Sequence, residues 1–230
     1  MRHYGLIGKD LGHSWSAEYF AEKFEKEGID ADYRLVELDN LAEVTLTLRC
    51  FNGVNVTIPY KTAIIPYLRE LDPIAKEIGA VNVVKDGKGY NTDWIGVTAS
   101  LLEVRPFRSW KLDDKVLILG QGGAAKAVKY ALGTLGVAAE MISARGRIDA
   151  DLRKYKLIVN ATPLGMWPNN DSLPDIDYNA LGSEHILFDC VYNPEETEFL
   201  SRGKAQGATV IGGKRMLEIQ AEESWKIWNN

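Results

Sequence analysis

The sequence contains little cysteine and little histidine, and their arrangement excludes several kinds of site. Its 230 residues include only two cysteines, Cys50 and Cys190, which are isolated and form no Cys-x-x-Cys pair. Such cysteines indicate reduced thiols and a cytoplasmic protein rather than a disulfide framework. The three histidines (His3, His13 and His185) lack the spacing of metal ligands, so we expect no metal site.

Long hydrophobic runs are also absent. No stretch approaches the roughly 18 consecutive apolar residues of a transmembrane helix, so none is predicted. The first residues, MRHYGLIGKDLGHSWS, are too polar and too rich in glycine for a signal peptide. The net charge of -5 argues against a nucleic-acid partner. We therefore expect small molecules, rather than membranes or nucleic acids, as partners.

The sequence does contain an alternation of strand and helix patterns, which predicts an α/β fold. After residue 110 the strand patterns are short apolar runs, typical of a parallel sheet covered by helices on both faces. Two α/β domains are predicted, meeting near residues 98–112. In the first domain the patterns predict strands at residues 3–8, 31–38 and 53–58, helices at 16–28, 41–49 and 61–71, and a hairpin at 80–93.

A glycine-rich turn follows the first strand of the second half. The segment VLILGQGGAAKA passes from a strand through Gly120, Gly122 and Gly123 into a helix. Glycines permit a tight turn and close approach of a ligand, and a helix N-terminus favours an anion such as pyrophosphate. Because the spacing departs from Gly-x-Gly-x-x-Gly, the pattern predicts either a dinucleotide site or simply a tight strand–helix turn.

The next strand ends in ISARGR, where an NAD-binding protein usually carries Asp or Glu for the ribose 2′-hydroxyl. Ser143 is neutral, whereas Arg145 and Arg147 are basic and can pair with a 2′-phosphate. The alternative is that both arginines are solvated surface residues. Their position favours NADP, but it does not decide which arginine makes the contact.

Two polar clusters follow strands of the first half. NVTIPYK ends in Lys61, and YNTDW contains Asp93. Reduction of a carbonyl requires a proton donor, and a lysine that a carboxylate orients and keeps charged is a suitable acid. We therefore expect Lys61 and Asp93 to meet in a cleft, and the alternative is a weak surface salt bridge.

Further polar side chains are candidates for the same cleft. Ser14 and Ser16 can bind a carboxylate, or one of them can cap the helix that follows. Asn55 and Asn82 stand within apolar strands, so their amides need partners, either a hydroxylated ligand or neighbouring backbone. Gln220, in the last helix, either reaches this cleft or is exposed to solvent.

Eight blocks, in order along nearly the whole chain, resemble the shikimate dehydrogenase family: YGLIGKDLGHSWS, GVNVTIPYK, GAVNVV, YNTDWIG, LGQGGAAKA, NATPLGM, FDCVYNP and MLEIQAEESW. The resemblance implies NADP-dependent reduction of 3-dehydroshikimate to shikimate in aromatic amino-acid biosynthesis. It also implies two domains: a substrate-binding domain of residues 1–98 plus 213–230, and a Rossmann-type NADP-binding domain of residues 99–212.

The resemblance assigns roles to individual residues. Lys61 resembles the catalytic lysine and Asp93 its partner. The positions implied on the substrate side are Ser14 and Ser16 for the carboxylate, and Thr57, Asn82, Asp93, Gln220 and Tyr192 around the ring. Those implied on the cofactor side are Gly120, Gly122, Gly123 and Ala124 in the phosphate loop, Arg145 at the 2′-phosphate, Asn160, Thr162 and Met166 near the nicotinamide half, and Gly213 at the nicotinamide amide.

The chain departs from the family where relatives carry NRT and it carries SARGR, with Arg145 opposite the family arginine. Two alternatives stay open at this point. One is a quinate/shikimate dehydrogenase that uses NAD, which the two arginines and Ser14 disfavour. The other is a non-catalytic relative that senses shikimate, which the retention of Lys61 and Asp93 disfavours. We expect a monomer or a homodimer.

Overall fold

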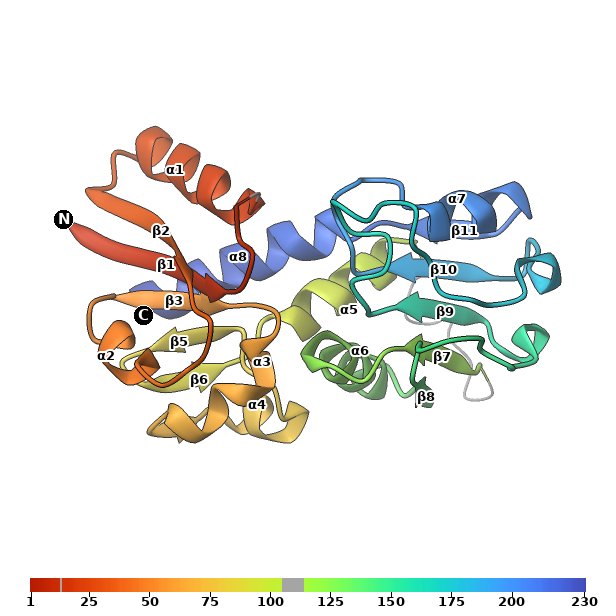
Figure 1. Cartoon of the computed structure of the whole chain (residues 1–230), viewed down its shortest axis with the longest axis horizontal. Helices are drawn as coiled ribbons and strands as arrows, with labels where there is room; N and C mark the ends of the chain where they lie inside the picture. The colour runs from red at the N-terminus through yellow and green to blue at the C-terminus, as the bar shows by residue number, and fades with distance from the viewer. Residues whose placement is uncertain (13, 105–113) are drawn as a thin grey trace. The chain divides into compact units, whose positions relative to one another are not determined.

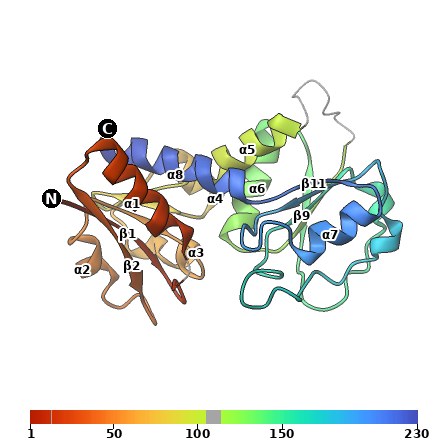
Figure 2. The same ribbon diagram turned by 90° about the horizontal axis from the view of Figure 1, so that it is seen from above.

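The computed structural model describes residues 1–12, 14–104 and 114–230, so His13 and much of the expected domain junction lie outside it. The chain divides into two compact units, both of the predicted α/β class, whose elements are labelled in Figures 1 and 2. Unit 1 comprises Met1–Thr92 with Ala221–Asn230, and unit 2 comprises Asp93–Gln220. The limits expected from the sequence differ from these by a few residues.

Unit 1 contains a mixed six-stranded sheet in the order β2-β1-β3-β5-β6-β4. β1 is parallel to β2 and β3, whereas β5 is antiparallel to β3 and β6. The predicted hairpin is confirmed: Asp86 and Gly87 have φ of 49° and 74°, as a two-residue turn between twisted strands requires. The strands are β1 (Arg2–Gly8), β2 (Ala31–Glu37), β3 (Gly53–Val56), β4 (Glu70–Leu71), β5 (Val83–Lys85) and β6 (Lys88–Tyr90).

Short helices connect these strands. The first ends at Gly28, whose φ of 65° provides the left-handed C-cap that the sequence predicts. The single helix predicted for residues 61–71 is wrong, because Pro66 has no N–H to continue an α-helix and a 3₁₀ turn and β4 replace it. The helices are α1 (Trp15–Glu27), α2 (Val44–Leu48), α3 (Tyr60–Ala63), η1 (Ile65–Tyr67) and α4 (Pro73–Ile78).

The C-terminal part of α8 (Lys214–Asn229) packs on the sheet of unit 1 through aromatic residues. Trp228 stacks on Tyr4 of β1 with 4.9 Å between ring centroids, and Phe20 and Phe24 of α1 join the same cluster. Gly53 of β3 permits this packing, because a Cβ there would lie 2.2 Å from Trp228 Cδ1. The last helix is therefore part of the first unit's core.

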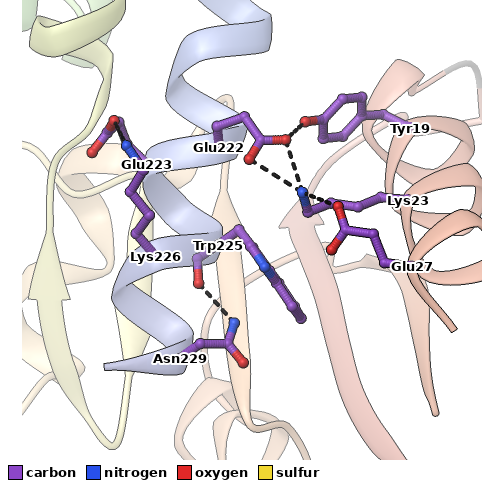
Figure 3. Close-up of polar contacts among 8 residues, drawn as sticks. All are labelled: Tyr19, Lys23, Glu27, Glu222, Glu223, Trp225, Lys226 and Asn229. Carbon is purple, nitrogen blue, oxygen red and sulfur yellow. Dashed lines mark hydrogen bonds and ion pairs between the residues drawn. The ribbon is translucent and has the colours of Figure 1, made fainter. Parts of the chain in front are cut away.

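Polar contacts join α8 to α1 beside the aromatic cluster (Figure 3). Glu222 accepts a hydrogen bond from the Tyr19 hydroxyl, and Lys23 lies 3.1 Å from the same carboxylate. Lys23 also pairs with Glu27 at 2.8 Å on its own helix. Burial raises the pKa of Glu222, and Lys226 opposes that rise. These contacts fix the position of α8 along α1.

Unit 2 contains a five-stranded parallel sheet in the order β11-β10-β9-β7-β8. Alternate strand residues face two separate hydrophobic clusters, one beneath α5, α6 and the start of α8, the other beneath α7. The prediction of a parallel sheet covered on both faces is therefore confirmed. The elements are α5 (Asp93–Val104), β7 (Val116–Leu119), α6 (Gly123–Thr134), β8 (Ala139–Ile142), η3 (Leu152–Lys154), β9 (Leu157–Asn160), η4 (Tyr178–Ala180), β10 (Ile186–Asp189), α7 (Glu198–Ala205) and β11 (Thr209–Ile211).

The strand order of unit 2 reverses at β7. The chain first places β8 on one side of β7 and then adds β9, β10 and β11 on the other side. In parallel sheets of this kind, ligands bind beyond the carboxyl ends of the strands where the order reverses. The loops that begin at Gly120, after β7, and at Ala161, after β9, leave the sheet at this point.

Candidate active site

Ser14 and Ser16 lie at the start of α1. Ser14 occupies the N-cap position with extended backbone (φ -76°, ψ 117°), but its hydroxyl makes no capping hydrogen bond. Ser16 lies inside the first turn and is buried, with 7% of its surface exposed. The Ser14 hydroxyl therefore does not cap α1, the Ser16 side chain hydrogen-bonds Tyr33, and the binding of a carboxylate by this pair stays a prediction.

The buried Asn55 of β3 is satisfied by the protein itself. Its Oδ1 accepts a hydrogen bond from the Tyr33 hydroxyl at 2.8 Å. Its Nδ2 donates to Asn82 O at 3.2 Å and to Ser224 Oγ at 2.9 Å. Burial raises the pKa of Tyr33, against the effect of a hydrogen bond from the Ser16 side chain. Of the two alternatives for Asn55, the neighbouring protein groups are the ones observed.

Asn82 binds Thr92 with both ends of its amide. Nδ2 donates to Thr92 Oγ1 at 2.9 Å, and Oδ1 accepts from Thr92 N at 2.7 Å. Asn82 and Thr92 are buried, with 2% and 0% exposed. This pair joins the start of β5 to the residue that precedes Asp93 in the chain.

Lys61 is held close to Asn82 through its backbone. It lies on the short helix α3, and its carbonyl accepts a hydrogen bond from Val81 N at 2.7 Å. Thr57, directly after β3, donates its N–H to Ile7 O at 2.9 Å, which ties it to the end of β1. Unit 1 thus gathers Thr57, Lys61 and Asn82 around the ends of β1, β3 and β5.

Asp93 and Gln220 belong to unit 2 in the division of the chain. Asp93 is the first residue of α5 and is buried, with 2% exposed. Gln220 is also buried, at 7% exposed, and its Nε2 donates to Leu217 O at 3.0 Å, so the alternative of solvent exposure is wrong. The pairing of Lys61 with Asp93 stays a prediction.

The glycine turn between β7 and α6 is tightly packed at Gly120 and open at Gly122. Gly120 has φ of 124°, and a Cβ there would lie 2.9 Å from Ala161 O, so no other residue fits without strain. Gly122 is the N-cap of α6, and no atom lies within 4 Å of the position of a Cβ there. Gly123 and Ala124 begin α6, whose N-terminal N–H groups and dipole suit a phosphate group.

The loop after β9 is organised by the side chain of Asn160. Its Oδ1 accepts from Thr162 N and Thr162 Oγ1, at 3.1 and 2.6 Å. Its Nδ2 donates to Leu164 O and to Asp189 Oδ1, each at 3.0 Å. Asn160 and Thr162 thus shape the loop, which carries the half-buried Met166 at its far end.

Asp189 is a buried carboxyl group that the sequence interpretation missed. It ends β10 with no exposed surface and accepts hydrogen bonds from Asn160 Nδ2, Val191 N and Thr197 Oγ1. Burial raises its pKa to about 6, and the three donors only partly oppose that rise. The available signal was a lone charge within the apolar run HILFDCVY.

The stability of the Asp189→Asn variant should depend on pH differently from that of the native chain. The folded-state pKa of about 6 exceeds the ordinary value of 3.8, so native stability falls as pH rises through this window. The fall amounts to about 3 kcal/mol, and asparagine does not titrate. Between pH 4 and pH 7.5, urea denaturation should show the stability of the variant rising relative to that of the native protein by most of this amount, about 2 kcal/mol, because the unfolded group is already partly ionised at pH 4.

The exposed Asp149→Asn change serves as the control for this comparison. Its stability relative to the native chain should differ little between the two pH values. A stability difference between Asp189→Asn and the native chain that stays constant with pH would show that the Asp189 carboxyl is not destabilised by burial.

The two arginines after β8 differ in their surroundings, although both are exposed. Arg147 lies 3.6 Å from Asp175 in a solvent-exposed ion pair. Arg145 is nearer the end of β8, and its backbone N–H donates to Ser143 Oγ at 3.3 Å. β8 is the neighbour of β7, so Arg145 follows the strand adjacent to the glycine turn. Which arginine contacts a 2′-phosphate stays a prediction.

Gly213 lies where two backbone segments approach closely. A Cβ there would be 2.6 Å from both Cys190 O and Val191 O, and its N–H donates to Val191 O at 3.1 Å. The half-buried Tyr192 follows directly on this segment. Gly213 is therefore required by packing against the loop after β10, whatever ligand that loop receives.

Among the described residues, no group of three or more His, Cys, Asp and Glu side chains could hold a metal ion. A search of the same residues found no helix with the length and hydropathy needed to span a bilayer. Taken separately, unit 1 carries Ser14, Ser16, Thr57, Lys61 and Asn82, and unit 2 carries Asp93, Gln220 and the glycine-containing loops at the carboxyl edge of its sheet.

The fold and these loops define a class: two-unit α/β proteins with a Rossmann-type nucleotide-binding sheet. The sequence profile described as shikimate dehydrogenase substrate binding domain matches residues 6–84. The shikimate dehydrogenase (NADP(+)) of Methanosphaera stadtmanae is 34% identical, over 97% of this chain and 90% of its own length. The chain belongs to the shikimate dehydrogenase family.

Solved structures agree with this assignment. Shikimate 5-dehydrogenase from Thermus thermophilus, in complex with NADP(H) and shikimate, is 29% identical with a TM-score of 0.86, over 99% of this chain and 93% of that one. Quinate dehydrogenase from Corynebacterium glutamicum, in complex with NAD, is also 29% identical with a TM-score of 0.80, over the same shares.

Proposed function

We propose that this protein is an NADP-dependent shikimate dehydrogenase, which reversibly reduces 3-dehydroshikimate to shikimate. One observation carries the proposal: along nearly its whole length the chain matches enzymes of that name, at about one-third identity. We further propose that it acts in the cytoplasm, as a monomer or a homodimer. Residues 1–98 plus 213–230 would form the substrate-binding catalytic domain and residues 99–212 the NADP-binding domain.

The residues at the carboxyl edge of unit 2 fit a dinucleotide phosphate. Space remains open around the N-cap Gly122, and Gly120 adopts a conformation that admits only glycine without strain. Arg145 follows the strand next to this turn and offers a cation for a 2′-phosphate. The residues proposed to hold NADP are Gly120, Gly122, Gly123, Ala124, Arg145, Asn160, Thr162, Met166 and Gly213.

When bound, NADPH supplies the hydride that reduces the substrate carbonyl. Lys61 donates a proton to the carbonyl oxygen as negative charge develops there. Asp93 orients the lysine, and a nearby carboxylate favours the charged ammonium form that this step requires. In the reverse direction the same lysine accepts the proton from the substrate hydroxyl.

The remaining polar side chains position the substrate. Ser14 and Ser16, whose hydroxyls are not used for capping, bind the substrate carboxylate. The ring hydroxyls require donors and acceptors at defined points, and an analogue without them leaves these groups unpaired. The side chains proposed for this role are Thr57, Asn82, Asp93, Tyr192 and Gln220.

Removal of the Arg145 side chain should weaken NADPH binding selectively. An exposed, charge-assisted contact with a 2′-phosphate contributes a binding free energy at the lower end of the range for hydrogen bonds to charged groups. Arg145→Ala should therefore raise the KM for NADPH about tenfold. The KM for NADH should stay within about twofold, because NADH lacks the 2′-phosphate. Arg147→Ala is the matched control. An equal loss with both cofactors would contradict the assignment.

The proposed function is tested by rates of oxidation with four pairs of reactants. Shikimate and quinate are each offered with NADP+ and with NAD+. We expect the highest kcat/KM for shikimate with NADP+. A preference for quinate with NAD+ would identify a quinate enzyme instead. Tight shikimate binding without turnover in any pair would identify a sensor.

A further inference from the structure

Ser224 is a fully buried hydroxyl on α8, beside the aromatic core of unit 1. None of its surface is exposed, and its helical neighbours Ala221 and Trp228 belong to the aromatic core of unit 1. A hydroxyl in such a place is unfavourable unless it is hydrogen-bonded, and alanine would suit both the helix and the core. The position therefore needs an explanation beyond packing.

The Ser224 hydroxyl joins two parts of the substrate side of unit 1. It accepts a hydrogen bond from Asn55 Nδ2 at 2.9 Å and lies 3.4 Å from Thr92 Oγ1. Asn55 and Thr92 both bind Asn82. Asn55 Nδ2 donates to the backbone oxygen of Asn82, and Thr92 forms hydrogen bonds with both ends of the side-chain amide of Asn82. Ser224 is thus one corner of a closed ring of four buried polar residues.

This ring supports residues assigned to the reaction. Asn82 is proposed to bind a ring hydroxyl of the substrate, and Thr92 directly precedes Asp93. The Asn82 carbonyl also accepts from Val56 N at 2.9 Å, one residue before Thr57. An amide held at both ends cannot rotate without breaking buried hydrogen bonds, which are costly to leave unmade.

The helix that carries Ser224 is itself held in place. Glu222, two residues earlier, binds Tyr19 and Lys23 of α1, the helix that begins with Ser14 at its N-cap (Figure 3). Trp228, four residues later, stacks on Tyr4 of β1, so any shift of this part of α8 would break contacts on both sides of Ser224.

We propose that Ser224 is a positioning residue for shikimate, acting through Asn55 and Thr92 to hold Asn82 and the residues around it. This inference rests on the proposed function. The ligand that Ser224 helps to position is the hydroxylated ring of shikimate, and Ser224 itself makes no contact with the cofactor.

The test measures shikimate and NADP+ affinities of the full-length Ser224→Ala variant by calorimetry. We expect the Kd for shikimate to rise about tenfold, as for loss of a buried hydrogen-bond partner. The Kd for NADP+ should stay within about twofold. Alanine is a good helix former and is smaller than serine, so it fits the site and the variant should fold. If Ser224 had a purely structural role, Ser224→Ala would lower the melting temperature but would not weaken shikimate binding more than NADP+ binding.

Ser100→Ala is the matched control, because Ser100 is also a buried helical serine. It is 1% exposed, and its hydroxyl donates to Gly96 O on its own helix at 2.8 Å. This variant should keep the native shikimate affinity. Ser224→Cys nearly preserves the size of the side chain and keeps a weak acceptor. Its Kd for shikimate should lie between those of the native chain and of Ser224→Ala.

A second measurement tests the route through Thr92. Thr92→Val removes the hydroxyl while nearly preserving shape, and the Ser224→Ala/Thr92→Val double variant should lose less affinity than the sum of the single losses. Full additivity, or native shikimate affinity in Ser224→Ala, would overturn the inference. Absence of shikimate binding in the native chain would instead overturn the proposed function.

Discussion

Lys61→Ala is expected to lower kcat by about two to four orders of magnitude, the usual contribution of a positioned general acid. The KM for 3-dehydroshikimate should change much less, because the proton is transferred only as the reaction proceeds. The steady-state rate of NADPH consumption at saturating substrate measures the effect.

The structure allows this substitution without general damage. Lys61 is partly exposed, and the bond that fixes its position, from Val81 N to its carbonyl, belongs to the backbone and survives the change. Lys76→Ala, on the exposed surface of α4, is the control and should keep native kcat. Normal turnover by a correctly folded Lys61→Ala protein would refute the role of the lysine.

Gly122→Asp should raise the KM for NADPH at least about a hundredfold while leaving the protein folded. Gly122 has extended backbone (φ -79°, ψ -170°) and open space at its Cβ position, and aspartate is among the best N-cap residues. A carboxylate about 4 Å from a phosphate charge costs about 4 kcal/mol at an effective dielectric constant of 20. Thermal melting and the KM for NADPH are the two measurements.

Gly122→Asn separates charge from size in this experiment. Asparagine has nearly the same shape and also caps helices well, but it carries no charge. We expect a much smaller rise in KM than with aspartate. If both variants bind NADPH equally well, the pyrophosphate does not lie at the N-terminus of α6.

The parallel sheet of unit 2 could be predicted because its three central strands, β7, β9 and β10, are buried on both faces and carry short apolar runs. The glycine turn was equally visible, since Gly120 adopts a positive φ that few other residues can adopt. Hydrophobic periodicity did not predict the end of the helix near Pro66. The neighbouring residues keep a helical pattern, but Pro66 lacks the N–H that an α-helix requires.

The polar network was harder to predict, because hydrogen bonds between distant segments leave no spacing in the sequence. Asn55 was recognised as needing partners, but Tyr33 and Ser224, which supply them, are 22 and 169 residues away. Asp189 was missed although two of its three donors, Val191 N and Thr197 Oγ1, are close in the sequence, because the pattern does not show that the carboxyl group is buried. A lone polar residue in an apolar pattern was the only signal.

The central claim is that hydride passes from NADPH to 3-dehydroshikimate on this protein. The most direct measurement supplies NADPH with both hydrogens at C4 of the nicotinamide replaced by deuterium, together with 3-dehydroshikimate, and analyses the product by mass spectrometry. We predict shikimate that is heavier by one deuterium. Formation of no shikimate, or of shikimate without the label, would contradict the account.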